Sequence, residues 1–229
     1  MDIILVPGLW LDSSSWGDVV PALEAAGHRP LPITLPGVGA PAESSADFGM
    51  SDWVAAVVDR IDAAEQPVVL VGHSGGGNVV WGAADARPDR VARVVFVDTV
   101  PPAPGSGISE FAIHDGVVPF PGWEFFPDED VYDLDETTRQ RTLGLTHSAP
   151  ARVPTDPIQL DGGRHGVPVT LLMGAMSADE VETAVDTWGA YGDEYRAIAD
   201  VEVVRIGSGH WPQFSQPARL AELIIAAVQ

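Results

Sequence analysis

A short aliphatic run leads into a serine with glycines on both sides in Val68-Val69-Leu70-Val71-Gly72-His73-Ser74-Gly75-Gly76, and a helix-like segment follows over residues 78–87. Continuous aliphatic runs are typical of strands that are covered on both faces. A chain that turns sharply from such a strand into a helix needs very small residues two positions before and after the corner, as Gly72 and Gly76 are around Ser74. We predict a strand–turn–helix unit that holds the Ser74 hydroxyl above the edge of a sheet, at the positive end of a helix.

Similar runs alternate with helix-like segments along most of the chain. The expected strands are Ile3–Val6, Pro30–Thr34, Val68–Val71, Val91–Val97, Val169–Met173 and Val201–Ile206. The expected helices are Trp16–Ala26, Ser51–Ala64 with Ser51 as N-cap, Asn78–Arg87, Asp179–Trp188 and Ala218–Val228. This alternation predicts an α/β fold with a mostly parallel six-stranded sheet and helices on both faces.

Residues 101–166 interrupt this rhythm, because they contain no clear strand but many proline, glycine and aromatic residues. A structureless loop of that length is improbable inside a compact domain. We therefore expect an inserted cap over residues 101–166, with the core domain formed by residues 1–100 and 167–229. Its aromatic side chains either pack the cap itself or contact a ligand.

The composition excludes several classes of protein. The 229 residues include no Cys, which excludes disulfides, thiol nucleophiles and thiolate metal sites, and no Lys, which excludes Schiff-base enzymes and Walker phosphate loops. The formal net charge of -21 would repel nucleic acid and anionic lipid. The expected partner is a small-molecule substrate, with no nucleic acid, membrane, metal or cofactor involved, and the sequence gives no indication of oligomeric state. The first basic residue is Arg29 and no apolar run reaches membrane-spanning length, so we expect a cytoplasmic protein.

A serine hydroxyl needs a base to act as a nucleophile. Of the six histidines, His210 is the favoured candidate because Gly207-Ser208-Gly209-His210 follows an expected strand and precedes the last helix. The carboxyl ends of strands are where open α/β sheets present groups to ligands. His73 adjoins the serine, and we expect it to contact substrate rather than to act as the base.

These features together resemble the α/β-hydrolase superfamily. The resemblance covers nearly the whole chain, through Val6-Pro7-Gly8-Leu9, the turn around Ser74, the late Gly209-His210 and their order. The run from Trp16 to Gly39 is most similar to the small esterase and hydroxynitrile-lyase branch. The chain begins at the first parallel strand, so we expect the family's leading antiparallel strands to be absent.

The resemblance implies a Ser–His–acid triad and an oxyanion hole. One donor of the hole would be the backbone N–H of Gly75, and the other would be that of Leu9. Many relatives have His-Gly where this chain has Pro7-Gly8, a change that should leave the backbone donor intact.

The acid of the triad stays open between two residues. The family often places it just after the penultimate strand, but Met173-Gly174-Ala175-Met176-Ser177 contains no carboxylate. Asp98 ends the strand after the helix that follows Ser74, where some relatives carry their acid, and it is the favoured candidate. Asp179 is the second candidate, although it could instead cap the following helix. A third possibility is that neither residue serves.

The expected activity is hydrolysis of a small to medium apolar carboxylic ester through an acyl-enzyme. A substrate pocket is expected to include Trp10, His73, Phe120, Trp123, Phe125 and Met176. The alternatives are a lyase or a cofactor-free oxygenase on the same scaffold, or a non-catalytic protein that binds a small ligand. A lyase is less favoured because related lyases use a cap lysine that this chain lacks. The survival of Ser74, His210 and both hole positions argues against a protein that only binds.

Overall fold

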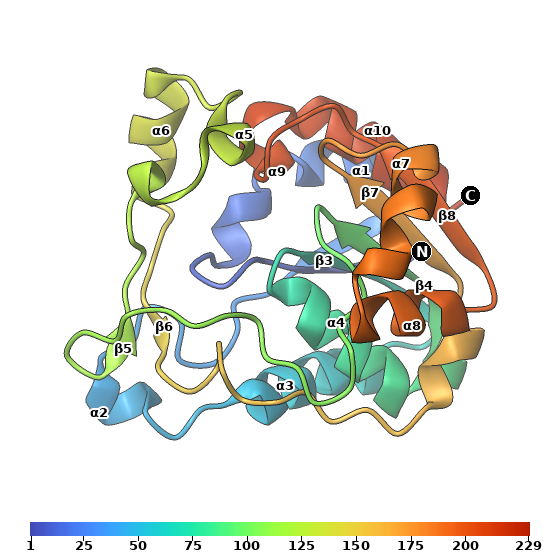
Figure 1. The fold of residues 1–229 in the computed structure, drawn as a ribbon, viewed down its shortest axis with the longest axis horizontal. Coiled ribbons are helices and arrows are strands. Elements are labelled where there is room, and N and C mark those ends of the chain that lie inside the picture. Colours follow the sequence, from blue (N-terminus) through green and yellow to red (C-terminus); the bar gives the residue numbers. More distant parts are fainter.

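The computed structural model describes residues 1–229 and contains one six-stranded sheet in which every strand pair is parallel (Figure 1). The strand order is β2-β1-β3-β4-β7-β8. The strands are β1 (Asp2–Val6), β2 (Arg29–Pro32), β3 (Val68–His73), β4 (Val91–Val97), β7 (Val169–Met173) and β8 (Val201–Arg205). All six predicted strands are therefore present, and the predicted α/β class and six-stranded parallel sheet are confirmed.

Helices cover both faces of the sheet, and side chains point alternately to the two faces along each strand. On β1, Ile4 and Val6 pack on one face and Ile3 and Leu5 on the other. The first face is covered by α3 (Met50–Ala63), α4 (Gly76–Ala86), α7 (Ala178–Ala184) and α8 (Ala190–Ala197). The second face is covered by α1 (Val20–Ala25) and α10 (Pro217–Ala227). This two-sided cover explains why the central strands are continuous aliphatic runs.

The helices differ from the prediction mainly at their ends. The segment predicted as Trp16–Ala26 is a 3-10 turn, η1 (Ser13–Trp16), followed by α1, and Pro21 stands in the first turn of α1. The segment predicted as Asp179–Trp188 ends its α-helix at Ala184 and continues as η5 (Val185–Thr187). The helix α8 was not predicted, since its alternation of small, charged and aromatic residues gives no clear apolar stripe.

The predicted N-cap of α3 is wrong. The helix begins at Met50 with Gly49 at the cap position, so Ser51 lies inside the first turn. The Asp52 carboxylate accepts a hydrogen bond from the Gly49 N–H at 2.8 Å. A side chain from the third position of the helix thus reaches back to the cap backbone and replaces the serine cap.

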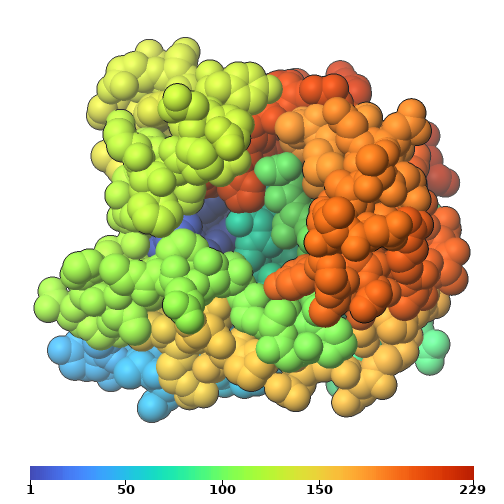
Figure 2. All heavy atoms as spheres, viewed as in Figure 1, coloured from blue at the N-terminus to red at the C-terminus, as the bar shows by residue number.

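The segment 101–166 lies outside the main sheet. It contains the two-stranded antiparallel sheet of β5 (Val117–Val118) and β6 (Ala149–Pro150), the turn η3 (Trp123–Phe125), and the short helices α5 (Asp128–Val131) and α6 (Glu136–Leu143). Figure 2 shows a hollow between this segment, in green and yellow, and the orange elements near the carboxyl end. That residues 101–166 form a separate cap with these boundaries stays a prediction.

The remaining helices are short: α2 (Ala42–Ser45), α9 (Pro212–Ser215) and the 3-10 turns η2 (Pro88–Arg90) and η4 (Gly163–Gly166). None of the helices combines the length and the apolar character needed to cross a bilayer.

Candidate active site

Ser74 occupies the corner between β3 and α4 with a φ of 51°, in the left-handed region that non-glycine residues seldom adopt. The corner is possible because its neighbours lack side chains. A Cβ on Gly72 would lie 2.7 Å from the carbonyl oxygen of Gly76, and a Cβ on Gly76 would lie 2.5 Å from that of Pro7. The predicted strand–turn–helix geometry around Ser74 is thus present, with backbone strain stored at the serine.

Asp98 follows β4 and also has a positive φ, 47°. Its Oδ2 lies 2.6 Å from Nδ1 of His210, and its Oδ1 accepts a hydrogen bond from the Gly174 N–H at 2.7 Å. Burial by itself raises the pKa of Asp98, but the hydrogen bond and charge of His210, helped by the Gly174 N–H, outweigh it and lower the pKa overall. Asp98 is therefore held as a carboxylate that orients the His210 ring.

Asp179 makes no hydrogen bond or ion pair with His210, whose carboxylate partner is Asp98. It lies in the first turn of α7, whose N-cap is Ser177, and the Glu180 carboxylate accepts hydrogen bonds from Ser177. The structure therefore brings Asp98, and not Asp179, to the histidine.

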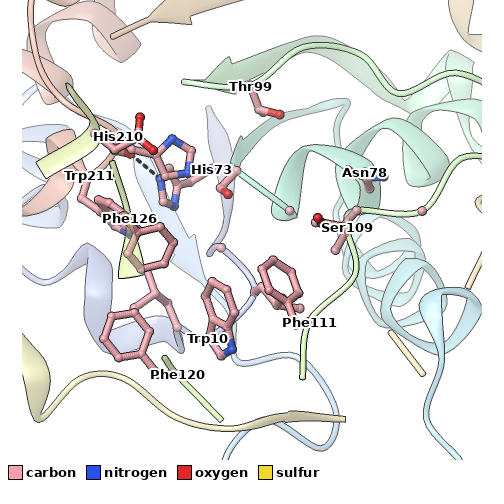
Figure 3. Close-up of a pocket in the computed structure, with 18 of the residues that line it drawn as sticks. Trp10, His73, Asn78, Thr99, Ser109, Phe111, Phe120, Phe126, His210 and Trp211 are labelled. Carbon is pink, nitrogen blue, oxygen red and sulfur yellow. Dashed lines mark hydrogen bonds between the residues drawn. The ribbon is translucent and has the colours of Figure 1, made fainter. Parts of the chain in front are cut away.

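The backbone around His210 is held from two sides. The His210 N–H donates to the carbonyl oxygen of Asp130 at 2.8 Å, and the Gly209 N–H donates to the Asp133 carboxylate at 2.9 Å. Both acceptors belong to the segment 101–166. Nε2 of His73 lies 2.7 Å from the carbonyl oxygen of His210 (Figure 3). The histidine loop is thus held between that segment and the turn around Ser74.

His73 is fully buried, and its charge state follows from that. Burial first, and then the nearby His210, lower the pKa of His73 to about 3. The ring is therefore neutral near pH 7, and its Nε2–H is the donor to the His210 carbonyl. Its Nδ1 faces the side-chain nitrogen of Gln213 at 3.2 Å and accepts from it.

Ser74 and His210 line the same cavity of about 300 Å³. Their side chains form no hydrogen bond with each other in this structure. Leu9 and Gly75 also line the cavity, and neither backbone N–H has a backbone acceptor within the chain. Two free donors beside a serine hydroxyl and a carboxylate-oriented histidine form an arrangement suited to acyl transfer.

Three of the six predicted pocket residues lie in the cavity wall, namely Trp10, His73 and Phe120. Trp123, Phe125 and Met176 do not line it. Trp123 is buried in the cluster that also contains Trp211, with 5.0 Å between the two ring centroids, and Phe125 is 58% exposed. Met176 packs against the main core.

Comparison with known proteins places this geometry in a family. The model of the Alpha/beta hydrolase family matches residues 3–223. The chain belongs to this family. The resemblance inferred from the turn around Ser74 and from Gly209-His210 is thereby confirmed.

Several esterases are similar to this alpha/beta hydrolase. The chain is 35% identical over 109 residues to a carbendazim hydrolyzing esterase of Nocardioides sp., a match that covers 47% of this chain and 45% of the relative. It is 40% identical over 106 residues to esterase PIR7B of Oryza sativa subsp. japonica, covering 44% of this chain and 40% of the relative. The matched parts thus span less than half the length of these two relatives.

A solved structure of similar fold is an extracellular alpha/beta-hydrolase from a Paenibacillus species. The two chains superpose with a TM-score of 0.79 at 20% sequence identity, over 99% of this chain and 98% of the other. At this level of identity the likeness concerns the fold.

Much of the cavity wall of this alpha/beta hydrolase was not anticipated from the sequence. The missed residues include Phe111, Phe126, Asp130, Tyr191 and Trp211. Trp211 directly follows His210, so its sequence position could have suggested it. The others come from the segment 101–166 and from α8, where no periodic pattern indicates which side chains face inward.

Proposed function

We propose that this alpha/beta hydrolase is a serine hydrolase that cleaves carboxylic esters through an acyl-enzyme, with Ser74, His210 and Asp98 as its catalytic triad. The 2.6 Å contact between Asp98 Oδ2 and His210 Nδ1, at the edge of the cavity that Ser74 lines, is the observation that supports this most. A carboxylate on Nδ1 leaves the other ring nitrogen of His210 free to accept a proton from the serine.

In the proposed reaction, Ser74 Oγ attacks the ester carbonyl carbon while His210 Nε2 takes the hydroxyl proton. The negative charge that develops on the carbonyl oxygen is stabilised by the N–H groups of Leu9 and Gly75. His210 then gives the proton to the departing alcohol, and water, activated by His210, releases the acid from the serine. Serine and histidine must approach during the reaction, and contacts at such sites often tighten only when substrate binds.

The strained backbone conformation of Ser74 helps to position the reacting groups in this mechanism. Its positive φ directs the hydroxyl toward the cavity, and the N–H of Gly75 then follows at the amino end of α4. Both the attacking oxygen and one hole donor are therefore positioned by the same tight turn.

The cavity supports an ester with an apolar portion of modest size. Its wall contains the rings of Trp10, Phe111, Phe120, Phe126 and Trp211. Figure 3 shows Phe120, Phe126 and Trp211 on the side away from Asn78 and Ser109. Rings of this kind bury large apolar area.

The test is the hydrolysis of 4-nitrophenyl acetate by wild type, Asp98→Asn and Asp179→Asn. We expect Asp98→Asn to lower kcat/KM by roughly a thousandfold or more, because the neutral amide no longer favours the productive form of His210. Asp179→Asn should stay within twofold of wild type. Equal activity of wild type and Asp98→Asn would refute the proposed triad, and inactivity of folded wild type on a panel of aryl and alkyl esters would refute the ester hydrolase.

A further inference from the structure

One side of the cavity is a continuous aromatic wall. The Trp10 ring lies 4.7 Å from that of Phe111 and 5.9 Å from that of Phe126, and Phe126 lies 4.6 Å from Trp211, all measured between ring centroids. These rings come from the loop after β1, from the segment 101–166 and from the histidine loop. Each of them lines the cavity.

The same cavity has a single acidic residue in its wall, Asp130, and no arginine. The Asp130 carboxylate makes no hydrogen bond or ion pair within the chain, although its backbone carbonyl holds the His210 N–H. Burial, with the charges of Asp98 and Glu129, raises the pKa of Asp130 against the opposing influence of His210. An ionised carboxylate in this place is therefore unfavourable by itself and would be stabilised by a cation beside it.

A purely apolar ligand would explain the rings but would leave Asp130 uncompensated when water is displaced. An anionic ligand would meet repulsion from Asp130 and from a chain of net charge -21. A cation satisfies both features, because positive groups are attracted to the faces of aromatic rings as well as to a carboxylate.

We infer that the aromatic wall and Asp130 form a subsite for a positively charged ammonium group, carried on the alcohol portion of the ester. This inference rests on the proposed ester hydrolysis. The alcohol portion is specified because its oxygen must receive a proton from His210, whose ring lies 4.7 Å from the adjoining ring of Trp211. The substrate class is thus the esters of amino alcohols with a small acyl group. The acyl group would lie on the side of Asn78 and Ser109.

The test compares the acetate esters of choline and of 3,3-dimethylbutanol, which have nearly the same shape and differ in whether the branched atom is a cationic nitrogen or a neutral carbon. For wild type we expect kcat/KM to be about tenfold higher for the choline ester. Asp130→Asn should remove most of this preference by lowering the value for the choline ester more than the value for the neutral ester. Glu129→Gln is the matched control, because Glu129 is exposed on the same short helix, α5, and is absent from the cavity wall.

Equal kcat/KM for the two esters in wild type would overturn the inference. A preference for the choline ester that survives in Asp130→Asn would also overturn it. The same holds if Glu129→Gln reduces the preference as much as Asp130→Asn does, since the effect would then come from the overall charge. If folded wild type cleaves no ester, the proposed function fails, and calorimetry with phenyltrimethylammonium tests the subsite separately. Millimolar or tighter binding that weakens about tenfold in Asp130→Asn would support the subsite, and no binding in that range would overturn it.

Discussion

His73 Nε2 donates a hydrogen bond to the carbonyl oxygen of His210 across 2.7 Å, so the residue before the proposed nucleophile holds the backbone of the proposed base. The bond links β3 to a loop that is 137 positions away in the sequence. Since Gln213 donates to the other ring nitrogen at 3.2 Å, the neutral ring is held at both ends. We therefore predict that His73, which also lines the cavity, positions His210.

Replacing this donor should impair catalysis more than binding. In His73→Leu the buried His210 carbonyl loses its partner, which should lower the free energy of unfolding by about 1–3 kcal/mol. We expect kcat on 4-nitrophenyl acetate to fall at least tenfold with KM changed less than threefold, and His73→Asn, which keeps an N–H donor, to recover part of the loss. His114→Leu, at an exposed position, is the control. A large rise in KM with kcat unchanged would contradict the positioning role.

The buried His73 also predicts how stability depends on pH. Its pKa in the folded protein is about 3, against an ordinary value of 6.5, so the unfolded chain binds a proton first as the pH falls. Proton binding by the unfolded state lowers stability, and the loss should develop between pH 6.5 and pH 3. Urea unfolding at several pH values should show a shallower decline for His73→Gln than for wild type. Parallel curves for the two proteins would show that His73 does not carry this dependence.

A methyl group at Gly76 should be strongly destabilising. Its Cβ would lie 2.5 Å from the Pro7 carbonyl oxygen and 2.7 Å from that of Val6, and backbone atoms cannot move aside as a flexible side chain can. We expect Gly76→Ala to lower the free energy of unfolding by about 2–3 kcal/mol. A Cβ on Gly166 would meet nothing within 4 Å, so Gly166→Ala should change it by no more than about 0.5 kcal/mol. Similar urea midpoints for the two variants would contradict the predicted packing.

Away from the cavity, Arg164 joins α4 to α8 by ion pairs with Asp85 at 3.0 Å and Glu194 at 2.7 Å, all three side chains being at least 95% buried. Removing the arginine takes the guanidinium away from two buried carboxylates, which keep only weaker partners such as the Gly162 N–H on Asp85 and Trp81 Nε1 on Glu194. Arg164→Met should therefore cost about 3–5 kcal/mol of unfolding free energy. Arg196 also has two acidic partners, Glu182 and Asp186, but it is 46% exposed. Arg196→Met should cost at most about 1 kcal/mol. Equal losses in thermal and urea unfolding would contradict this difference.

The parts of the site that could be predicted are those determined by residues close together in the sequence. Gly72 and Gly76 indicate a tight turn because only glycine avoids the clash there, and a strand before Ser74 with a helix after it is visible in residue type alone. His210 could be chosen because the Gly-rich loop follows a strand whose carboxyl end reaches the same sheet edge. Asp98 could be favoured over Asp179 but not decided, since the distance to His210 depends on β4, β7 and β8 lying side by side.

The cavity wall could be predicted only in part. Trp10 lies next to the first strand and could be placed, whereas the segment 101–166 has no helical or strand period to separate inward from outward side chains. Phe125 and Phe126 are neighbours in the sequence, yet Phe125 is 58% exposed and Phe126 lines the cavity. Which of the two side chains faces the cavity depends on the 3-10 turn η3 and on the packing of Phe126 against Trp211. Asp130 was not predicted either, because nothing in the sequence indicates that its backbone carbonyl accepts a hydrogen bond from the His210 N–H.

The most direct test of the proposed nucleophile and base is labelling with a fluorophosphonate, followed by peptide mass mapping. We predict one adduct per chain, on Ser74, no labelling in Ser74→Ala, and a labelling rate about a thousandfold lower in folded His210→Ala. An adduct on a different residue, or labelling at Ser74 that proceeds equally fast without the His210 imidazole, would contradict the account.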